Sequence, residues 1–237
     1  MMETSHGCAP VFQAPATDLE KLIVHPTAAH HERTLIFLHG YHMEAADLLD
    51  LFLALSRVHK AWRFVLPQAP KMRVTATGDE CASWFDYLTD YQGASEDAID
   101  VFSLRVQRES LRQILHAEVS LLEGRSSHVY LGGLSQGGTM ALDAATYMQV
   151  GGVVTLLSPR SSASLSRPLS CPWLALMSQD DEVFPLSWAR NLLVGACSVT
   201  IVPGTHWLED DEERSFLRSS LEKFEAMVKN PDAGLQV

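Results

Sequence analysis

The sequence predicts an α/β fold in which helices cover both faces of a mostly parallel sheet. Three observations lead to this expectation. Short apolar runs alternate along the chain with longer runs of helical period. Most of the short runs are apolar throughout rather than alternating with polar residues, which is typical of strands buried on both faces. A glycine-rich turn around Ser135 joins one such strand to a helix.

The elements follow in order along the chain. Strand-like runs are expected at residues 19–24, 34–38, 63–66, 127–131, 153–157, 173–177 and 198–202. Helical runs are expected at residues 45–58, from about 95 to 122, and at 139–147, 186–193 and 211–228, and Ser95 and Asp97 are candidate caps of the second. Residues 67–95 show no clear period, as is common in functional or mobile segments.

Composition and length describe one globular unit. The 237 residues are 46% hydrophobic and 20% charged, and they show neither a linker nor an internal repeat. We therefore expect one α/β domain over residues 1–237, with loose termini at 1–18 and 230–237 and no large cap domain.

The formal charge of −11 argues against a nucleic-acid partner and disfavours docking to anionic membrane by charge alone. No signal peptide or membrane span is expected, although transient contact with a membrane surface stays open. Four scattered cysteines, Cys8 among them, are expected to be reduced thiols in a cytoplasmic protein. The oligomeric state is left open.

The turn at residues 133–137 has the pattern Gly-x-Ser-x-Gly between strand and helix, which is the arrangement of a nucleophile elbow. So tight a turn forces the serine into a strained backbone conformation and needs glycines two residues before and after it. The following helix N-terminus can offer N–H groups to a developing oxyanion. Ser135 is therefore the candidate nucleophile.

A serine nucleophile needs a base, and the base needs a carboxylate that orients it. His206 follows the strand at 198–202 and is the candidate base. The loop after the strand at 173–177 holds Asp180, Asp181 and Glu182, and spacing and chemistry alone leave the choice among them open. The order serine, acid, histidine is the one that this sheet type requires.

Two backbone N–H groups are candidates for the oxyanion hole. One belongs to Gln136, directly after the serine. The other belongs to Tyr41, because Gly40 before it permits a close approach of the backbone to substrate. The histidines at 30, 31, 39 and 42 lack a recognised ligand spacing, so we expect neither a metal nor a cofactor.

Several motifs together resemble the acyl-protein thioesterase and carboxylesterase branch of the α/β-hydrolases over nearly the whole chain. They are Leu35-Ile36-Phe37-Leu38-His39-Gly40, Pro67-Gln68-Ala69-Pro70, Ser83-Trp84-Phe85-Asp86, Gly132-Gly133-Leu134-Ser135-Gln136-Gly137-Gly138, and Asp181 four residues before Pro185. The resemblance implies Ser135 as nucleophile, Asp181 as acid and His206 as base. The chain departs from it at Tyr41, where the family usually has an apolar residue that lines the acyl channel.

Apolar side chains near the expected site suggest an acyl pocket. The candidate substrate-binding residues are Met43, Met72, Trp84, Phe184 and Trp207, although Trp84 and its neighbour Phe85 are also candidates for simply anchoring their loop. The leading hypothesis is a serine hydrolase that cleaves acyl thioesters or esters, plausibly S-acyl groups on proteins. The alternatives are a carboxylesterase or lysophospholipase of small or lipid esters, and a non-catalytic binding protein on the same fold.

Overall fold

The computed structural model describes residues 18–90, 98–207 and 210–229. Seven strands form the central sheet in the order β1-β3-β2-β6-β7-β8-β9. Their bounds are β1 Lys21–Val24, β2 Arg33–Leu38, β3 Trp62–Pro67, β6 Val129–Leu134, β7 Gly152–Leu156, β8 Trp173–Ser178 and β9 Ser198–Val202. Every neighbouring pair runs parallel except the edge pair β1 and β3.

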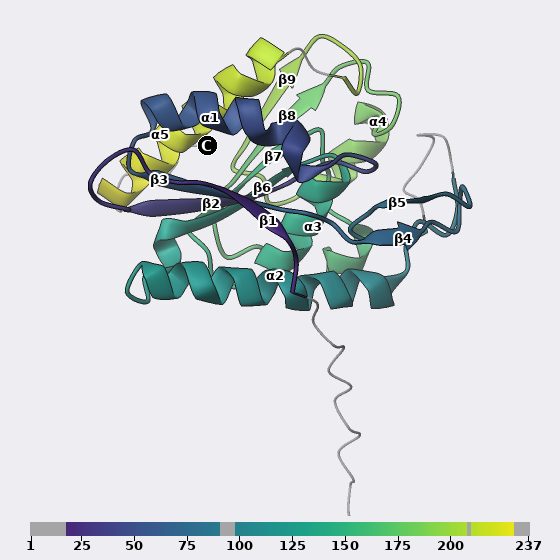
Figure 1. Ribbon diagram of the computed structural model, residues 1–237. Helices are drawn as coiled ribbons and strands as arrows, with labels where there is room; N and C mark the ends of the chain where they lie inside the picture. Colours follow the sequence, from purple (N-terminus) through teal and green to yellow (C-terminus); the bar gives the residue numbers. More distant parts are fainter. Residues whose placement is uncertain (1–17, 91–97, 208–209, 230–237) are drawn as a thin grey trace, which may run out of the picture.

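Helices lie on both faces of this sheet, as Figure 1 shows: α1 and α5 lie on one side, and α2 and α3 on the other. The α-helices are α1 Leu49–Val58, α2 Val101–Leu121, α3 Gln136–Ala145, α4 Leu186–Ala189 and α5 Asp210–Lys229. Short 3-10 turns occur at η1 Ala45–Leu48, η2 Ser126–His128, η3 Ser162–Ser164 and η4 Arg190–Leu192.

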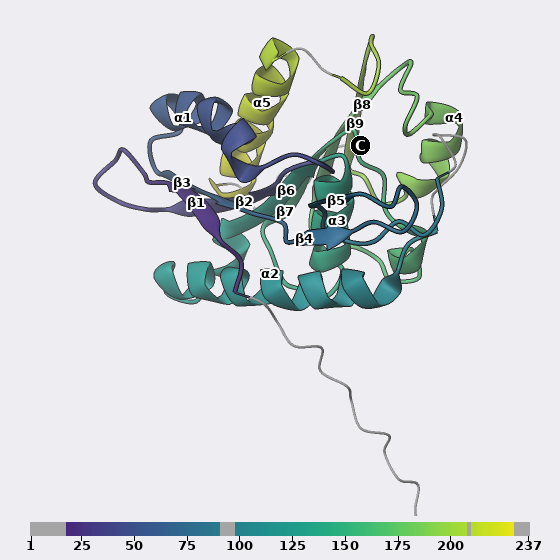
Figure 2. The same cartoon turned by 45° about the vertical axis from the view of Figure 1, so that its right-hand side comes forward.

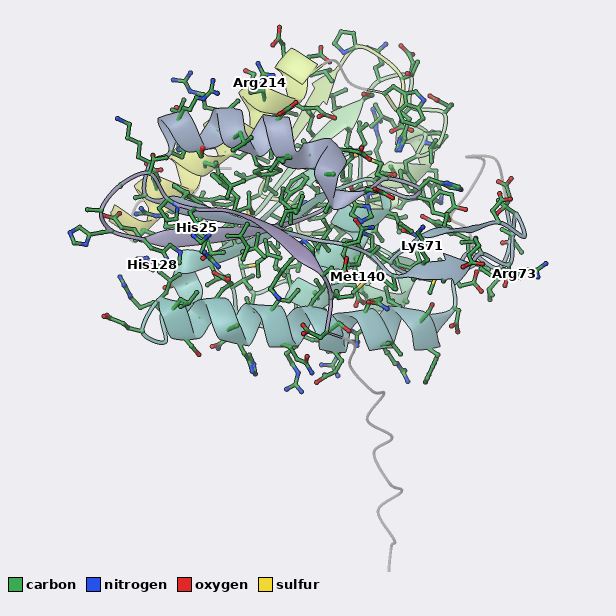
Figure 3. The ribbon with its side chains drawn as sticks, viewed as in Figure 1. His25, Lys71, Arg73, His128, Met140 and Arg214 are labelled. Atoms are coloured by element: carbon green, nitrogen blue, oxygen red, sulfur yellow. The ribbon has the colours of Figure 1, made fainter. Side chains whose placement is uncertain are left out.

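Two apolar cores follow from this layering. Phe52 of α1 and Phe224 of α5 pack over one face of the sheet. Leu111 of α2 and Met140 of α3 pack over the other, and Figure 3 shows Met140 in the interior between α2 and the sheet. Because β2, β7 and β8 are buried at every residue, their sequences had to be apolar throughout. The predicted fold class is confirmed, and no cap domain is present among the described residues.

The long helix differs from its expected start. Helix α2 begins at Val101, and the Asp100 carboxylate caps it by accepting the N–H groups of Phe102 (3.1 Å) and Ser103 (2.9 Å). The expected caps Ser95 and Asp97 lie outside the described residues. Three acidic or hydroxyl side chains within six residues are equivalent by type, so the sequence alone could not distinguish them.

The segment expected to be irregular contains a small antiparallel pair, β4 Lys71–Arg73 and β5 Glu80–Ala82. Figures 1 and 2 place this pair beside α3. Its three-residue strands are too short to show a period in the sequence. No helix in the described part of the chain is both long and apolar enough to cross a membrane.

Candidate active site

Ser135 stands at the sharp turn between β6 and α3, with φ 52° and ψ −122°. This conformation is strained for a residue with a side chain. The turn also leaves no room at its flanks: a Cβ on Gly133 would collide with the backbone of Gly137, and one on Gly137 would collide with the carbonyl oxygens of Leu38 and His39. The elbow is therefore possible only because glycines stand at these two positions.

His206 and Asp181 meet Ser135 from the ends of two other strands. His206 Nε2 lies 2.9 Å from Ser135 Oγ, and His206 Nδ1 lies 2.9 and 3.0 Å from the two carboxylate oxygens of Asp181. Asp181 and His206 are both buried, at 3% and 8% exposure. An ionised carboxylate only accepts, so Nδ1 carries the proton and Nε2 is left to accept the serine hydroxyl hydrogen.

The three acidic residues of one loop take different positions. Asp181 Oδ1 also accepts the backbone N–H groups of Val183 (2.9 Å) and Phe184 (2.7 Å), which orients the carboxylate toward His206. The Asp180 side chain is exposed instead. Glu182 accepts the backbone N–H of His206 through Oε2 at 3.0 Å, a contact with the base that sequence reasoning missed.

The loop after β2 passes close to the serine. A Cβ on Gly40 would lie 3.7 Å from the Cβ of Ser135. His39 holds this loop: its Nε2 accepts the N–H of Ala69 at 3.0 Å, so its Nδ1 carries the proton and donates to the Gly40 carbonyl at 2.8 Å. Burial lowers the pKa of His39, and the contact with the Gly40 carbonyl offsets this only in part. The neutral imidazole thus keeps both hydrogen bonds.

The side chain of Gln136 braces the other side of the elbow. Its Oε1 accepts the N–H of Trp84 at 2.9 Å, and its Nε2 donates to Ser83 Oγ at 2.8 Å and to the Phe85 carbonyl at 3.0 Å. The Trp84 indole N–H in turn donates to the carbonyl of His39 at 2.8 Å. The Ser-Trp-Phe motif is therefore a clamp that joins the elbow to the loop after β2. Motif comparison singled it out, but only the fold reveals the clamp.

A pocket of about 610 Å³ opens over the site. Its lining includes Ser135 and His206, the expected substrate-binding residues Met43, Phe184 and Trp207, residues of α1 and α5 such as Leu48, Leu51 and Arg214, and, from the loops, Tyr41, Val74, Ala76, Thr77 and Tyr87. Arg214 lies at the end of α5 that faces away from α2 in Figure 3. Phe184 and Trp207 both present ring edges to His206, with centroids 5.5 and 6.1 Å from it.

Two expected substrate-binding residues do not line this pocket. Trp84 is fully buried in the clamp, as a loop anchor. Met72 lies half-buried on β4 between Lys71 and Arg73, which Figure 3 shows at the outer edge of the molecule. Both were expected at the pocket because they are apolar and near it in sequence, whereas the strand and clamp geometry turns them elsewhere. Among the described residues, no group of histidine, cysteine or acidic side chains is arranged to hold a metal ion.

Comparison with known proteins assigns a family. The model of the Phospholipase/Carboxylesterase family matches residues 19–192, which is well over half of the chain. The chain belongs to this family. The matched range includes Ser135 and Asp181 but ends before His206.

Relatives within reach of sequence comparison agree with this assignment. The chain is 29% identical over 182 residues to acyl-protein thioesterase 1 of Cryptococcus neoformans, covering 74% of this chain and 71% of that protein. It is 24% identical over 188 residues to acyl-protein thioesterase 1 of Gibberella zeae, covering 69% and 75%. This member of the Phospholipase/Carboxylesterase family is thus a hydrolase of the esterase and thioesterase class.

Solved structures share the fold. Arabidopsis thaliana SOBER1 superposes with a TM-score of 0.70 at 22% identity, covering 81% of this chain and 98% of that one. Zea mays acyl-protein thioesterase 2 superposes with a TM-score of 0.64 at 17% identity, covering 87% and 99%. At these identities the likeness establishes the α/β-hydrolase architecture alone.

Proposed function

We propose that the chain hydrolyses acyl esters and thioesters through Ser135 as nucleophile, His206 as general base and Asp181 as the orienting acid. The observation that carries the proposal is the continuous hydrogen-bonded chain from Asp181 through both ring nitrogens of His206 to Ser135 Oγ. This is the geometry that activates a serine hydroxyl.

The steps follow from the protonation states. His206 Nε2 takes the proton of Ser135 as Oγ attacks the acyl carbonyl carbon, and Asp181 stabilises the imidazolium that forms. The tetrahedral oxyanion would be held by the N–H groups of Tyr41 and Gln136, each donor contributing roughly 3–4 kcal/mol to lowering the barrier. His206 then gives the proton to the departing thiol or alcohol. A water molecule, activated in the same way, releases the acyl group from Ser135.

S-acylated proteins are the substrate class that we propose first, because the sequence relatives are acyl-protein thioesterases. A second candidate is the hydrolysis of small carboxylic or lipid esters, which the phenol and threonine side chains of Tyr41 and Thr77 in the pocket lining favour over a wholly apolar acyl channel. A cytosolic location stays a prediction; Cys81, Cys171 and Cys197 are free thiols.

The test is hydrolysis of a p-nitrophenyl ester and of an S-palmitoyl peptide, with labelling by a fluorophosphonate probe. Ser135→Ala should abolish all three signals, while Asp181→Asn should lower kcat by roughly a thousandfold or more and leave the fold intact. Ser187→Ala, at an exposed serine of α4, is the matched control and should behave as the native chain. Turnover that persists in Ser135→Ala would overturn the proposal. Labelling without turnover on either substrate would favour a binding protein.

A further inference from the structure

The side chain of Tyr41 crosses from the loop after β2 to the turn between β4 and β5. Its hydroxyl lies 3.5 Å from Thr77 Oγ1, at the outer limit of a hydrogen bond. Its ring meets that of Tyr87 edge-on, with centroids 5.7 Å apart. Tyr41, Thr77 and Tyr87 all line the pocket that contains Ser135. The phenol ring is therefore a wall of this pocket, held mainly by ring packing.

The turn that the phenol meets is fixed by its own hydrogen bonds. Asp86 accepts both the N–H and the hydroxyl of Thr75 at 2.7 Å. The N–H of Ala76 donates to the carbonyl of Tyr87 at 2.8 Å, and the N–H of Gly78 donates to the carbonyl of Val74 at 2.7 Å. Because these bonds close the turn on itself, it cannot give way to a long substrate without losing several of them.

The backbone of Tyr41 is fixed as well. Before it, His39 holds the carbonyl of Gly40. After it, His42 adopts a left-handed φ of 66° and donates its N–H to the carbonyl of Ala82 on β5 at 3.1 Å. A strained residue tied to a neighbouring strand keeps the loop in one conformation. The phenol is thus held at a set position next to Gly40, which itself approaches Ser135 closely.

From these contacts we infer that Tyr41 sets the acyl-chain length that the pocket accepts, and that the native chain prefers short acyl groups. The inference rests on the proposed function, since the acyl group is the one that Ser135 would carry. An acyl chain that runs from Ser135 toward Val74 and Ala76 must share its space with the phenol ring. A smaller apolar side chain at position 41 would open that space to further methylene groups.

The experiment compares native chain, Tyr41→Leu and Tyr41→Phe on p-nitrophenyl acetate, butyrate, octanoate and laurate. Each methylene that gains a full apolar contact adds about fourfold to kcat/KM. With two such contacts restored, Tyr41→Leu should raise the ratio of octanoate to acetate kcat/KM by roughly tenfold. Tyr41→Phe keeps the ring and loses only the weak hydroxyl contact, so it should retain the native ratio.

The ratio separates a specificity role from an oxyanion role, because the Tyr41 N–H would serve every acyl chain alike. A ratio unchanged in Tyr41→Leu, with all substrates slowed equally, would overturn the inference and leave the proposed function standing. So would a Tyr41→Phe variant that shifts the ratio as far as Tyr41→Leu. If the native chain hydrolyses none of the four esters, the proposed function fails and the inference with it. Tyr41→Met replaces Tyr41→Leu should the latter fail to fold by circular dichroism.

Discussion

His39 Nε2 accepts the backbone N–H of Ala69 at 3.0 Å, and this contact ties the loop that leads to Gly40 to the neighbouring segment after β3. Only the neutral imidazole can make it while Nδ1 donates to the Gly40 carbonyl. Protonation of one buried ring would therefore break a contact that positions the proposed oxyanion hole. The stability of this loop is linked to pH.

The sign of this linkage follows from the direction of the pKa shift. Burial lowers the pKa of His39 from its ordinary 6.5. A lowered pKa means that His39 contributes stability that is fully present above about pH 6.5 and is lost as the pH falls toward the folded value. The free energy of unfolding in urea should thus fall more steeply between about pH 7.5 and 5.5 for the native chain than for His39→Gln, whose side chain does not titrate in this range. Parallel curves for the two proteins would contradict the prediction.

Glu182 is expected to act as a positioning residue for the base. Its carboxylate accepts the His206 backbone N–H at 3.0 Å, whereas its own side chain does not touch Ser135. Glu182→Ala should lower kcat about tenfold with little change in KM, since a hydrogen bond to a charged group is worth about 1.5–3 kcal/mol. Glu182→Gln keeps an acceptor oxygen and should recover most of the rate. Equal losses in both variants would indicate that charge, rather than this hydrogen bond, is what matters.

Gln136 should matter for stability through its side chain and for catalysis through its backbone. Gln136→Leu preserves the backbone but orphans the buried N–H of Trp84, which should cost about 1–3 kcal/mol of unfolding free energy. The Phe85 carbonyl keeps the Ser83 hydroxyl as a donor, so the cost should stay within that range. Denaturant unfolding measures it. Gln136→Glu, which retains the acceptor, is the matched variant, and a native-like stability of Gln136→Leu would contradict the clamp.

Much of this protein was determined locally by its sequence. The strands of the sheet are apolar because both faces are covered, so their runs could be read directly, and the glycines at 133 and 137 revealed the elbow because no other residue fits there. The order of Ser135 and His206 along the chain, each after a strand, predicted that the two would meet at one edge of a parallel sheet.

Contacts between distant segments were decided only by the tertiary structure. Asp181 meets His206 whereas Asp180 faces solvent, because the two backbone N–H groups that follow turn a single carboxylate inward. Trp84 left the expected pocket because its N–H groups and ring complete the clamp. The phenol of Tyr41 reaches Thr77, 36 residues along the chain. Such pairings depend on packing between segments far apart in the chain, which local sequence patterns do not encode.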